Sequence, residues 1–431
     1  MVYDYYTASA TIRPRRFTNS IDTPMKIHDF LGQLTGMHQM MYQLIKSVPE
    51  EFCYQTNNPD IPPMAWLYGR AIYVETYWLR EVLQEQGDKS GLVREIFKAG
   101  KGNDKATLAQ LPPFDHLLNW ALELLDDNVM RFANPSLNDG KVHNHPMMLD
   151  GSIPNLILQS YAELYEMMLY QLHERQLQSP ASHQVAKPLV ATAPSTDHAD
   201  IHQGHYRIGA KEDPAAKDNE LPPQIVELSG YRIDRSPVSN GAWLSFIEAD
   251  GYNNEELWSD AGWEWSQKTA DHQRPHIWRQ DIQRRWFTIG INGPSDLITE
   301  DPVSGISQHE ALAYANWVSS QDDELLKGAV VQHEYQWEVA LRSREVTDYG
   351  RVWEWCGHPF HTYTGYKAPE YAEATTIDFD AGHFTLRGGS IHTQLPLRRT
   401  SYRNHDKPES RFRMSGTRLV FPPSEMPWNK K

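Results

Sequence analysis

The chain has 431 residues, a formal net charge of −15 at pH 7 and a hydrophobic share of 40%. A chain of this length can form two or three domains with substantial cores, and this composition is typical of a folded protein rather than a disordered one. The negative charge argues against general nucleic-acid binding, which needs a basic surface.

The chain has two cysteines, Cys53 and Cys356, and no apolar stretch that approaches the roughly 20 residues of a membrane span. Two cysteines are too few for a disulfide framework, so a reducing compartment is the default. The first residues lack the basic-then-apolar order of a secretory signal peptide. We therefore expect a cytoplasmic protein without membrane contact.

Residues 26–175 show helical periodicity and follow an N-terminal extension, residues 1–25. Apolar side chains recur there every three or four residues, and Pro62 with Pro63 marks one helix start. Four helices joined by polar connections are typical of an antiparallel four-helix bundle. The predicted helices lie at about residues 30–45, 66–83, 117–125 and 153–177.

The composition changes after the fourth predicted helix. Residues 176–203 contain Ser-Pro and Pro-Ser pairs with little apolar periodicity, so they are predicted to be a linker. Residues 204–422 carry short apolar runs rich in Gly, Trp and Asn, and one clear amphipathic helix at 308–320. This pattern predicts a compact, irregular domain, followed by a tail at 423–431, and the whole chain falls in the α+β class.

Four motifs near the C-terminus are the most specific signal in the chain. They read VWEW at 352–355, LRGGS at 386–390, RNHD at 403–406 and GTRL at 416–419. In this order they resemble the closing signature of a formylglycine-generating-enzyme/sulfatase-modifying-factor (FGE-sulfatase) domain. Ile391 and Thr417 depart from that signature, which has tryptophan and phenylalanine there. Further matching blocks lie at 204–209, 218–222, 231–240, 251–263, 302–317 and 334–340.

The resemblance implies a C-type-lectin-like fold for the second domain. An FGE-sulfatase domain joined to a DinB-like four-helix bundle is the layout of the non-haem iron sulfoxide synthases of ergothioneine and ovothiol biosynthesis, and relatives that make selenoneine share it. The block at 251–263 favours this branch. Formylglycine-generating enzymes use a pair of cysteines, whereas this domain has Cys356 alone.

The resemblance also implies a function. It is that of an Fe(II)- and O₂-dependent enzyme that forms a C–S or C–Se bond between a histidine-derived imidazole and a thiol or selenol. No nucleotide cofactor is indicated, and the sequence leaves the acceptor, the donor and the oligomeric state open.

Several site residues follow from the resemblance. Tyr363 stands in the segment that carries a proton-donating pocket tyrosine in the family. Arg403, Asp406 and Arg411 stand in the region that contacts the thiol substrate, and a guanidinium is suited to capture a carboxylate. A structural salt-bridge cluster is the alternative interpretation of these three residues.

The family's iron-binding histidines are not matched in the bundle. Arg70 stands at the position of one ligand on the second long helix, and an arginine cannot bind a metal. On the fourth helix the two remaining positions are Ser160 and Leu164, or Tyr161 and Tyr165 if the register shifts by one residue. The remaining metal candidates of the bundle are His143, His145, Glu163 and Glu166.

Two functions follow from this mismatch. An active enzyme would need iron held by another set of ligands, and a pocket between the domains lined by Arg70, Glu166, Tyr363 and Asp406. A degenerate, metal-free paralogue would instead bind a small zwitterionic ligand or a partner, with the Arg70 cation in place of the metal. A structural or interaction module is the third possibility.

Overall fold

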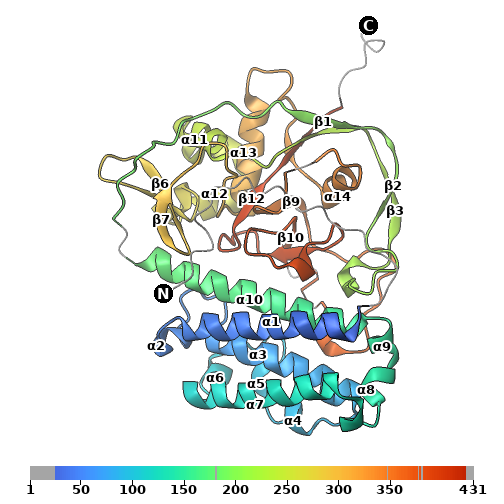
Figure 1. Ribbon diagram of the computed structural model, residues 1–431. Coiled ribbons are helices and arrows are strands. Elements are labelled where there is room, and N and C mark those ends of the chain that lie inside the picture. Colours follow the sequence, from blue (N-terminus) through green and yellow to red (C-terminus); the bar gives the residue numbers. More distant parts are fainter. Residues whose placement is uncertain (1–24, 180–181, 347, 377, 380–381, 424–431) are drawn as a thin grey trace.

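The computed structural model describes residues 25–179, 182–346, 348–376, 378–379 and 382–423. A helical bundle forms one half of the molecule and an irregular domain rich in short strands forms the other, and α10 lies along the boundary between them (Figure 1). The predicted N-terminal extension and C-terminal tail fall almost entirely outside the described residues.

The four predicted helices of the bundle are confirmed. They are α1 (Ile27–Lys46), α3 (Met64–Thr76), α7 (Phe114–Ala133) and α10 (Ser152–Gln178). A π-helical segment, Tyr77–Leu83, continues α3 directly. Short helices fill the connections: α2 (Glu50–Cys53), α4 (Asp88–Gly91), α5 (Arg94–Phe97), α6 (Lys105–Leu108), α8 (Lys141–Asn144) and α9 (Pro146–Leu149).

Burial explains the arrangement of the long helices. Helix α1 buries a stripe of apolar residues at spacings of three and four, as an amphipathic helix on a core does. Helix α3 is buried at almost every position because it packs against both α7 and α10. Helix α10 is buried on several sides, since it contacts the bundle on one face and the second domain on the other (Figure 1).

Two four-stranded sheets form the centre of the second domain. One has the order β1 (His198–Ile201), β4 (Tyr231–Asp234), β13 (Leu419–Phe421) and β8 (Val330–Val331). The other has the order β11 (Asn404–Asp406), β10 (Phe384–Arg387), β9 (Trp353–Pro359) and β12 (Ser415–Thr417), with β12 parallel to β9.

Smaller elements surround these sheets. The hairpin of β2 (Gly204–Ile208) and β3 (Gln224–Leu228) and the meander of β5 (Trp278–Gln280), β6 (Trp286–Gly290) and β7 (Gly293–Asp296) are separate sheets. The helices are α11 (Asn240–Glu248), α12 (Asp260–Ser266), α13 (Gln308–Ser320) and α14 (Glu334–Arg342). Helix α13 confirms the amphipathic helix predicted at 308–320.

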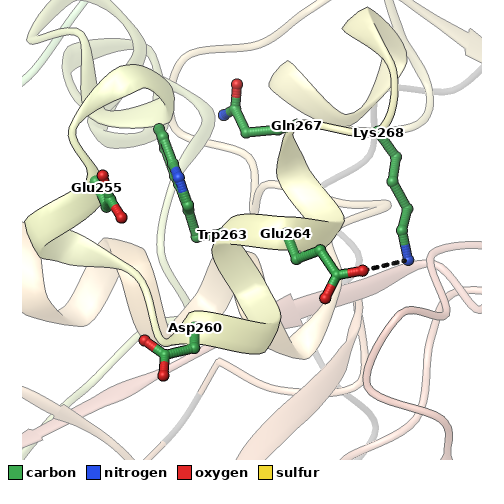
Figure 2. Close-up of a pocket in the computed structure, with 6 residues that line it drawn as sticks. All are labelled: Glu255, Asp260, Trp263, Glu264, Gln267 and Lys268. Atoms are coloured by element: carbon green, nitrogen blue, oxygen red, sulfur yellow. Dashed lines mark ion pairs between the residues drawn. The ribbon is translucent and has the colours of Figure 1, made fainter.

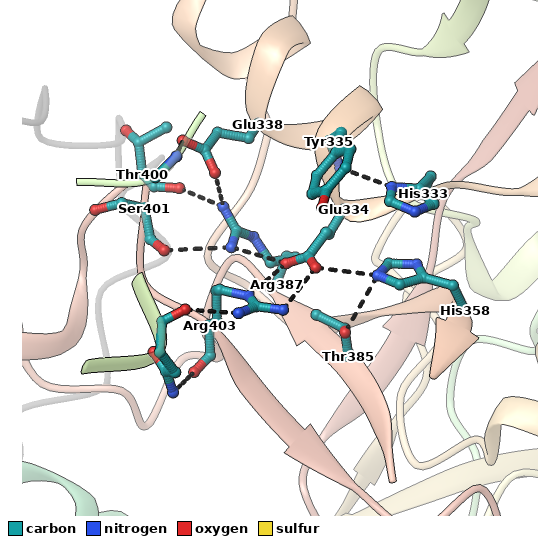
Figure 3. Close-up of polar contacts among 12 residues, drawn as sticks. His333, Glu334, Tyr335, Glu338, His358, Thr385, Arg387, Thr400, Ser401 and Arg403 are labelled. Atoms are coloured by element: carbon teal, nitrogen blue, oxygen red, sulfur yellow. Dashed lines mark hydrogen bonds and ion pairs between the residues drawn. The ribbon is translucent and has the colours of Figure 1, made fainter. Parts of the chain in front are cut away.

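The C-terminal motifs build the scaffold of this domain. The arginines of LRGGS and RNHD, Arg387 and Arg403, are fully buried and meet the carboxylates of Glu334 and Glu338 on α14 (Figure 3). Gly388 and Gly389 have φ angles of 95° and 84°. That left-handed region disfavours any residue with a Cβ, which accounts for the double glycine.

None of the helices within the described residues is long and apolar enough to cross a bilayer.

Candidate active site

A cavity of about 380 Å³ lies between the bundle and the second domain. Its size is in the usual range for a small-molecule site. The bundle contributes side chains from α3 and α10, and the second domain contributes loops and β11. The charged or polar lining residues include Arg70, Ser160, Glu163, Glu166, Lys217, Asp218, Glu373, Asp378, Tyr402, Arg403, His405 and Arg413.

A second hollow, beside α12, is an open depression in the surface (Figure 2). Its only ion pair joins Glu264 to Lys268 at 3.8 Å, and both side chains are more than half exposed. It contains none of the residues expected at a site and no residue of the bundle. We therefore assign the interdomain cavity as the candidate active site.

The bundle positions that correspond to the family's iron-binding histidines lie together at the cavity. Ser160 and Leu164 line it beside Arg70, whereas Tyr161 points to Glu75, to which its hydroxyl donates at 2.7 Å. These three cavity positions offer a guanidinium, a hydroxyl and an aliphatic chain, and the Ser160 hydroxyl donates to the Leu156 carbonyl. Such a set does not fit iron, which prefers imidazole and carboxylate ligands.

Arg70 makes a bridge between the domains. One of its nitrogens donates to the Phe97 carbonyl at 2.6 Å, and another donates to Glu373 at 2.7 Å. Both side chains of this ion pair are largely buried, at 15% and 6% exposure. A buried pair of this kind is costly to break, because either partner alone would be an uncompensated charge.

The two predicted carboxylates of α10 both reach the cavity and have partners from the second domain. Glu163 pairs with Lys217 and accepts the hydroxyl of Tyr402 at 2.6 Å. Burial raises the pKa of Glu163, but Lys217 and the Tyr402 hydrogen bond outweigh burial, so the pKa lies below its ordinary value.

Glu166 connects α10 to the C-terminal motifs. Its Oε1 accepts hydrogen bonds from Trp353 at 3.0 Å, Ser390 at 3.0 Å and Thr393 at 2.8 Å, besides one from Tyr170 on its own helix at 2.5 Å. Trp353 belongs to VWEW and Ser390 to LRGGS. Glu166 is thus held in one orientation at the domain boundary.

The remaining bundle candidates lie elsewhere. His143 is in α8, and His145 caps α9 by accepting from the Met147 amide at 3.3 Å. Neither histidine lines the cavity. The structure therefore brings Glu163 and Glu166 to the candidate site but does not bring the two histidines there.

Arg403 lines the cavity, but its guanidinium is already engaged. It donates twice to Glu334, at 2.8 Å each (Figure 3). It also donates to the backbone carbonyls of Asn219 and His361. Burial favours the neutral acid of Glu334, yet Arg403, His358 and Arg387 together outweigh burial and hold the pKa of this carboxyl well below its usual range.

The other three site residues of the C-terminal region differ in position. Contrary to the prediction, neither Asp406 nor Tyr363 lines the cavity. Asp406 pairs with Arg413, which does. Arg411 donates to the backbone carbonyls of Asp271 and Arg274, away from the cavity.

Tyr363 is buried beneath the guanidinium of Arg403, which lies 4.2 Å from the centre of the tyrosine ring. The Tyr363 hydroxyl has no hydrogen-bond partner among the described residues. Burial and Glu334 raise the pKa of Tyr363 well above the ordinary value, so its hydroxyl stays protonated.

Three residues that the sequence did not single out meet at the cavity wall. Asp378, His383 and His405 place one potential ligand atom each within 4.8 Å of the others. The Nδ1 atoms of the two histidines lie 2.8 Å apart. Burial and the neighbouring His383 hold the pKa of His405 well below its ordinary value, so this imidazole is neutral. Two imidazoles and a carboxylate are a donor set that fits non-haem iron.

Known proteins resemble part of the chain. A family model described as a sulfatase-modifying factor enzyme 1-like (FGE-sulfatase) domain matches residues 186–349. Hercynine oxygenase from Mycobacterium tuberculosis is 28% identical over 258 residues, which are 50% of this chain and 58% of that protein. Formylglycine-generating enzyme from Thermomonospora curvata is 30% identical over 174 residues, which are 37% of this chain and 50% of that protein.

Among solved structures, PvdO from Pseudomonas aeruginosa aligns with 55% of this chain and 99% of its own, at 16% identity and a TM-score of 0.37. The chain spans little more than half the length of the hercynine oxygenases that it matches. The family match, these relatives and the fold agree with the sequence resemblance: the chain joins a DinB-like helical bundle to an FGE-sulfatase domain and is similar to the hercynine oxygenases.

Proposed function

We propose that this protein is an O₂-dependent, iron-using enzyme that joins sulfur or selenium to a histidine-derived imidazole, as in ergothioneine or selenoneine biosynthesis. The observation that carries the proposal is the cavity between the two domains, lined by charged side chains from both. The similarity to hercynine oxygenases supports the same reaction class.

The cavity suits a small zwitterion. Lys217 and Arg413 would exchange their present partners, Glu163 and Asp406, for a substrate carboxylate. Asp218 has only neutral hydrogen-bond donors around it and would meet an ammonium group. The ring of Tyr402 adds an aromatic face, over which Lys217 already lies at 5.8 Å. Histidine betaine, with one carboxylate and one quaternary ammonium, matches this combination of groups.

The overall reaction balances without a further reductant. One imidazole C–H bond and one S–H bond are broken, a C–S bond is formed, one oxygen atom of O₂ ends on sulfur, and the other leaves in water. Bound iron would supply the activation of O₂. The residues of the chain would bind the zwitterion and orient its ring.

The test is a reaction with purified protein, Fe(II), O₂, histidine betaine and a thiol or selenol, with the product detected by mass spectrometry. We expect a coupled product from the unchanged protein and a strong loss in Lys217→Met. Lys268→Met, in the open hollow beside α12, is the matched control and should stay active. A protein that forms no product with any thiol or selenol would refute the proposal.

The ion pair of Arg70 with Glu373 favours a second candidate function, a metal-free protein that binds a small zwitterion without catalysis. In this alternative Arg70, whose charge is balanced by Glu373, occupies the position of one of the family's metal ligands. It predicts that histidine betaine raises the melting temperature equally with and without a chelator, and that no product forms. A rise that depends on iron would contradict it.

A further inference from the structure

We infer that Asp378, His383 and His405 form a binding site for a divalent transition metal on the FGE-sulfatase side of the interdomain cavity. The ligand atoms of the three residues are close enough to share one ion. The inference that a metal binds depends only on this geometry, whereas the assignment of iron as that metal rests on the proposed function.

The distances suit a shared ion. Two nitrogens that bind one metal at about 2.1 Å in neighbouring positions lie about 3 Å apart, and the Nδ1 atoms of His383 and His405 lie 2.8 Å apart. Asp378 adds a carboxylate within the same 4.8 Å. Two histidines and one carboxylate leave further coordination positions for small molecules.

Strand pairing places the two histidines together. In the antiparallel pair of β10 and β11, His405 lies opposite Thr385. His383 directly precedes the first residue of β10 and lies two residues before Thr385, so the pairing of β10 with β11 brings its backbone close to that of His405. The register of the sheet, rather than a flexible side chain, thus sets their distance.

Aromatic stacking holds His405 and the segment of Asp378 in place. The ring of His405 stacks on Phe360, with ring centres 4.2 Å apart, and Phe360 stacks on Phe379, with centres 4.9 Å apart. Phe379 directly follows Asp378, so this stack fixes the backbone that carries the carboxylate. A site whose ligands are positioned before the ion arrives loses less entropy on binding.

The surrounding charge permits a cation. Asp218, on the cavity wall, adds a carboxylate whose hydrogen bonds come from the neutral donors Tyr366 and Thr376. Each of the three cations whose charge acts on His405 is paired with a carboxylate: Arg413 with Asp406, Lys217 with Glu163, and Arg403 with Glu334.

Asp378 and His405 also line the cavity. A metal held by this triad therefore lies at the cavity wall, next to the space in which a small substrate would bind. The site would replace, on the opposite side of the cavity, the ligands that the bundle lacks at Arg70, Ser160 and Leu164.

Cobalt(II) is a suitable probe, because its visible spectrum reports imidazole ligands. The full chain, stripped of metal with a chelator, is titrated with Co(II) without oxygen or substrate, and the bound metal is measured by equilibrium dialysis. We expect about one ion per chain, and a loss of affinity of at least about tenfold in His383→Gln and His405→Gln. The double variant His143→Gln/His145→Gln is the matched control and should bind as the unchanged protein does.

Asp378→Asn provides a further variant if a histidine variant does not fold. Co(II) should raise the melting temperature of the unchanged protein more than that of Asp378→Asn. The inference is overturned if the unchanged protein binds no Co(II), or if the histidine or Asp378 variants bind as tightly as it does. The contact between the histidines would then be a structural hydrogen bond only.

These measurements separate the metal site from the proposed reaction. A chain that binds Co(II) through the triad but forms no product with Fe(II), O₂ and substrates would keep the metal site and lose the proposed function. Product formation by His383→Gln and His405→Gln would keep the function and remove this site from it.

Discussion

Replacing Arg403 by methionine tests whether this arginine is part of the scaffold or captures substrate. Its side chain is fully buried, and so is that of Glu334, to which it donates twice. In Arg403→Met, Glu334 keeps only His358 at 3.1 Å and Arg387 at 3.4 Å. The carbonyls of Asn219 and His361 each lose a donor as well.

Removing one partner of a buried ion pair costs about 3–5 kcal/mol. A loss of this size is a large part of the free energy of unfolding of a typical domain, which is about 5–15 kcal/mol. With a urea dependence of about 3 kcal/mol per molar, the unfolding midpoint should fall by more than about 1 M. Urea unfolding followed by tryptophan fluorescence measures this shift.

The double variant Glu334→Gln/Arg403→Met should be more stable than Arg403→Met, because it removes a buried carboxylate that has lost its main partner. Arg207→Met is the matched control: Arg207 is exposed on β2, so its loss should change the free energy of unfolding by less than about 0.5 kcal/mol. A midpoint unchanged in Arg403→Met, together with weaker binding of a carboxylate substrate, would refute the scaffold role.

Three further predictions concern single positions. The lowered pKa of Glu163 stabilises the folded protein at pH values above the pKa of this group in the unfolded chain, and this stability is lost as the pH falls through the lower folded pKa. Lys217→Met removes a main cause of the lowered pKa, so the melting temperature, measured over a series of acidic pH values, should depend less on pH in this variant. Because burial raises the pKa of the Cys356 thiol well above its ordinary value, iodoacetamide should label this thiol only on unfolding, and rapid labelling of the native protein would contradict its burial. Gly389→Ala should lower the free energy of unfolding by about 1–2 kcal/mol or more, because its φ is 84° and a Cβ would meet Thr393 at 3.2 Å; a change below about 0.5 kcal/mol would show that the loop adapts.

The sequence predicted α1 and α7 from a periodic apolar pattern, whereas α3 and α10, which are buried on several sides, appeared as long helical segments. It did not predict α4, α5, α8 or α9, since a helix of four residues is too short to show a period. The FGE-sulfatase domain was recognised from ordered motifs rather than from periodicity, because its strands have only two to seven residues.

The candidate site was harder to predict. The sequence predicts a pocket between the domains lined by Arg70, Glu166, Tyr363 and Asp406. Arg70 and Glu166 line the cavity, whereas Tyr363 and Asp406 do not. The convergence of His383 and His405 depends on the register of β10 and β11, which no local pattern encodes. The one available signal was His405 within RNHD, but that motif was interpreted as a substrate-binding region because of its arginine and aspartate.

The position of α10 limits how this protein can be divided. Glu166 on this helix receives hydrogen bonds from Trp353, Ser390 and Thr393, so a fragment that starts after the linker would leave three buried donors without their acceptor. The two halves are therefore not interchangeable modules. A chimera that joins this C-terminal domain to a different bundle would have to supply a carboxylate at the same point of its last helix, whatever that bundle binds.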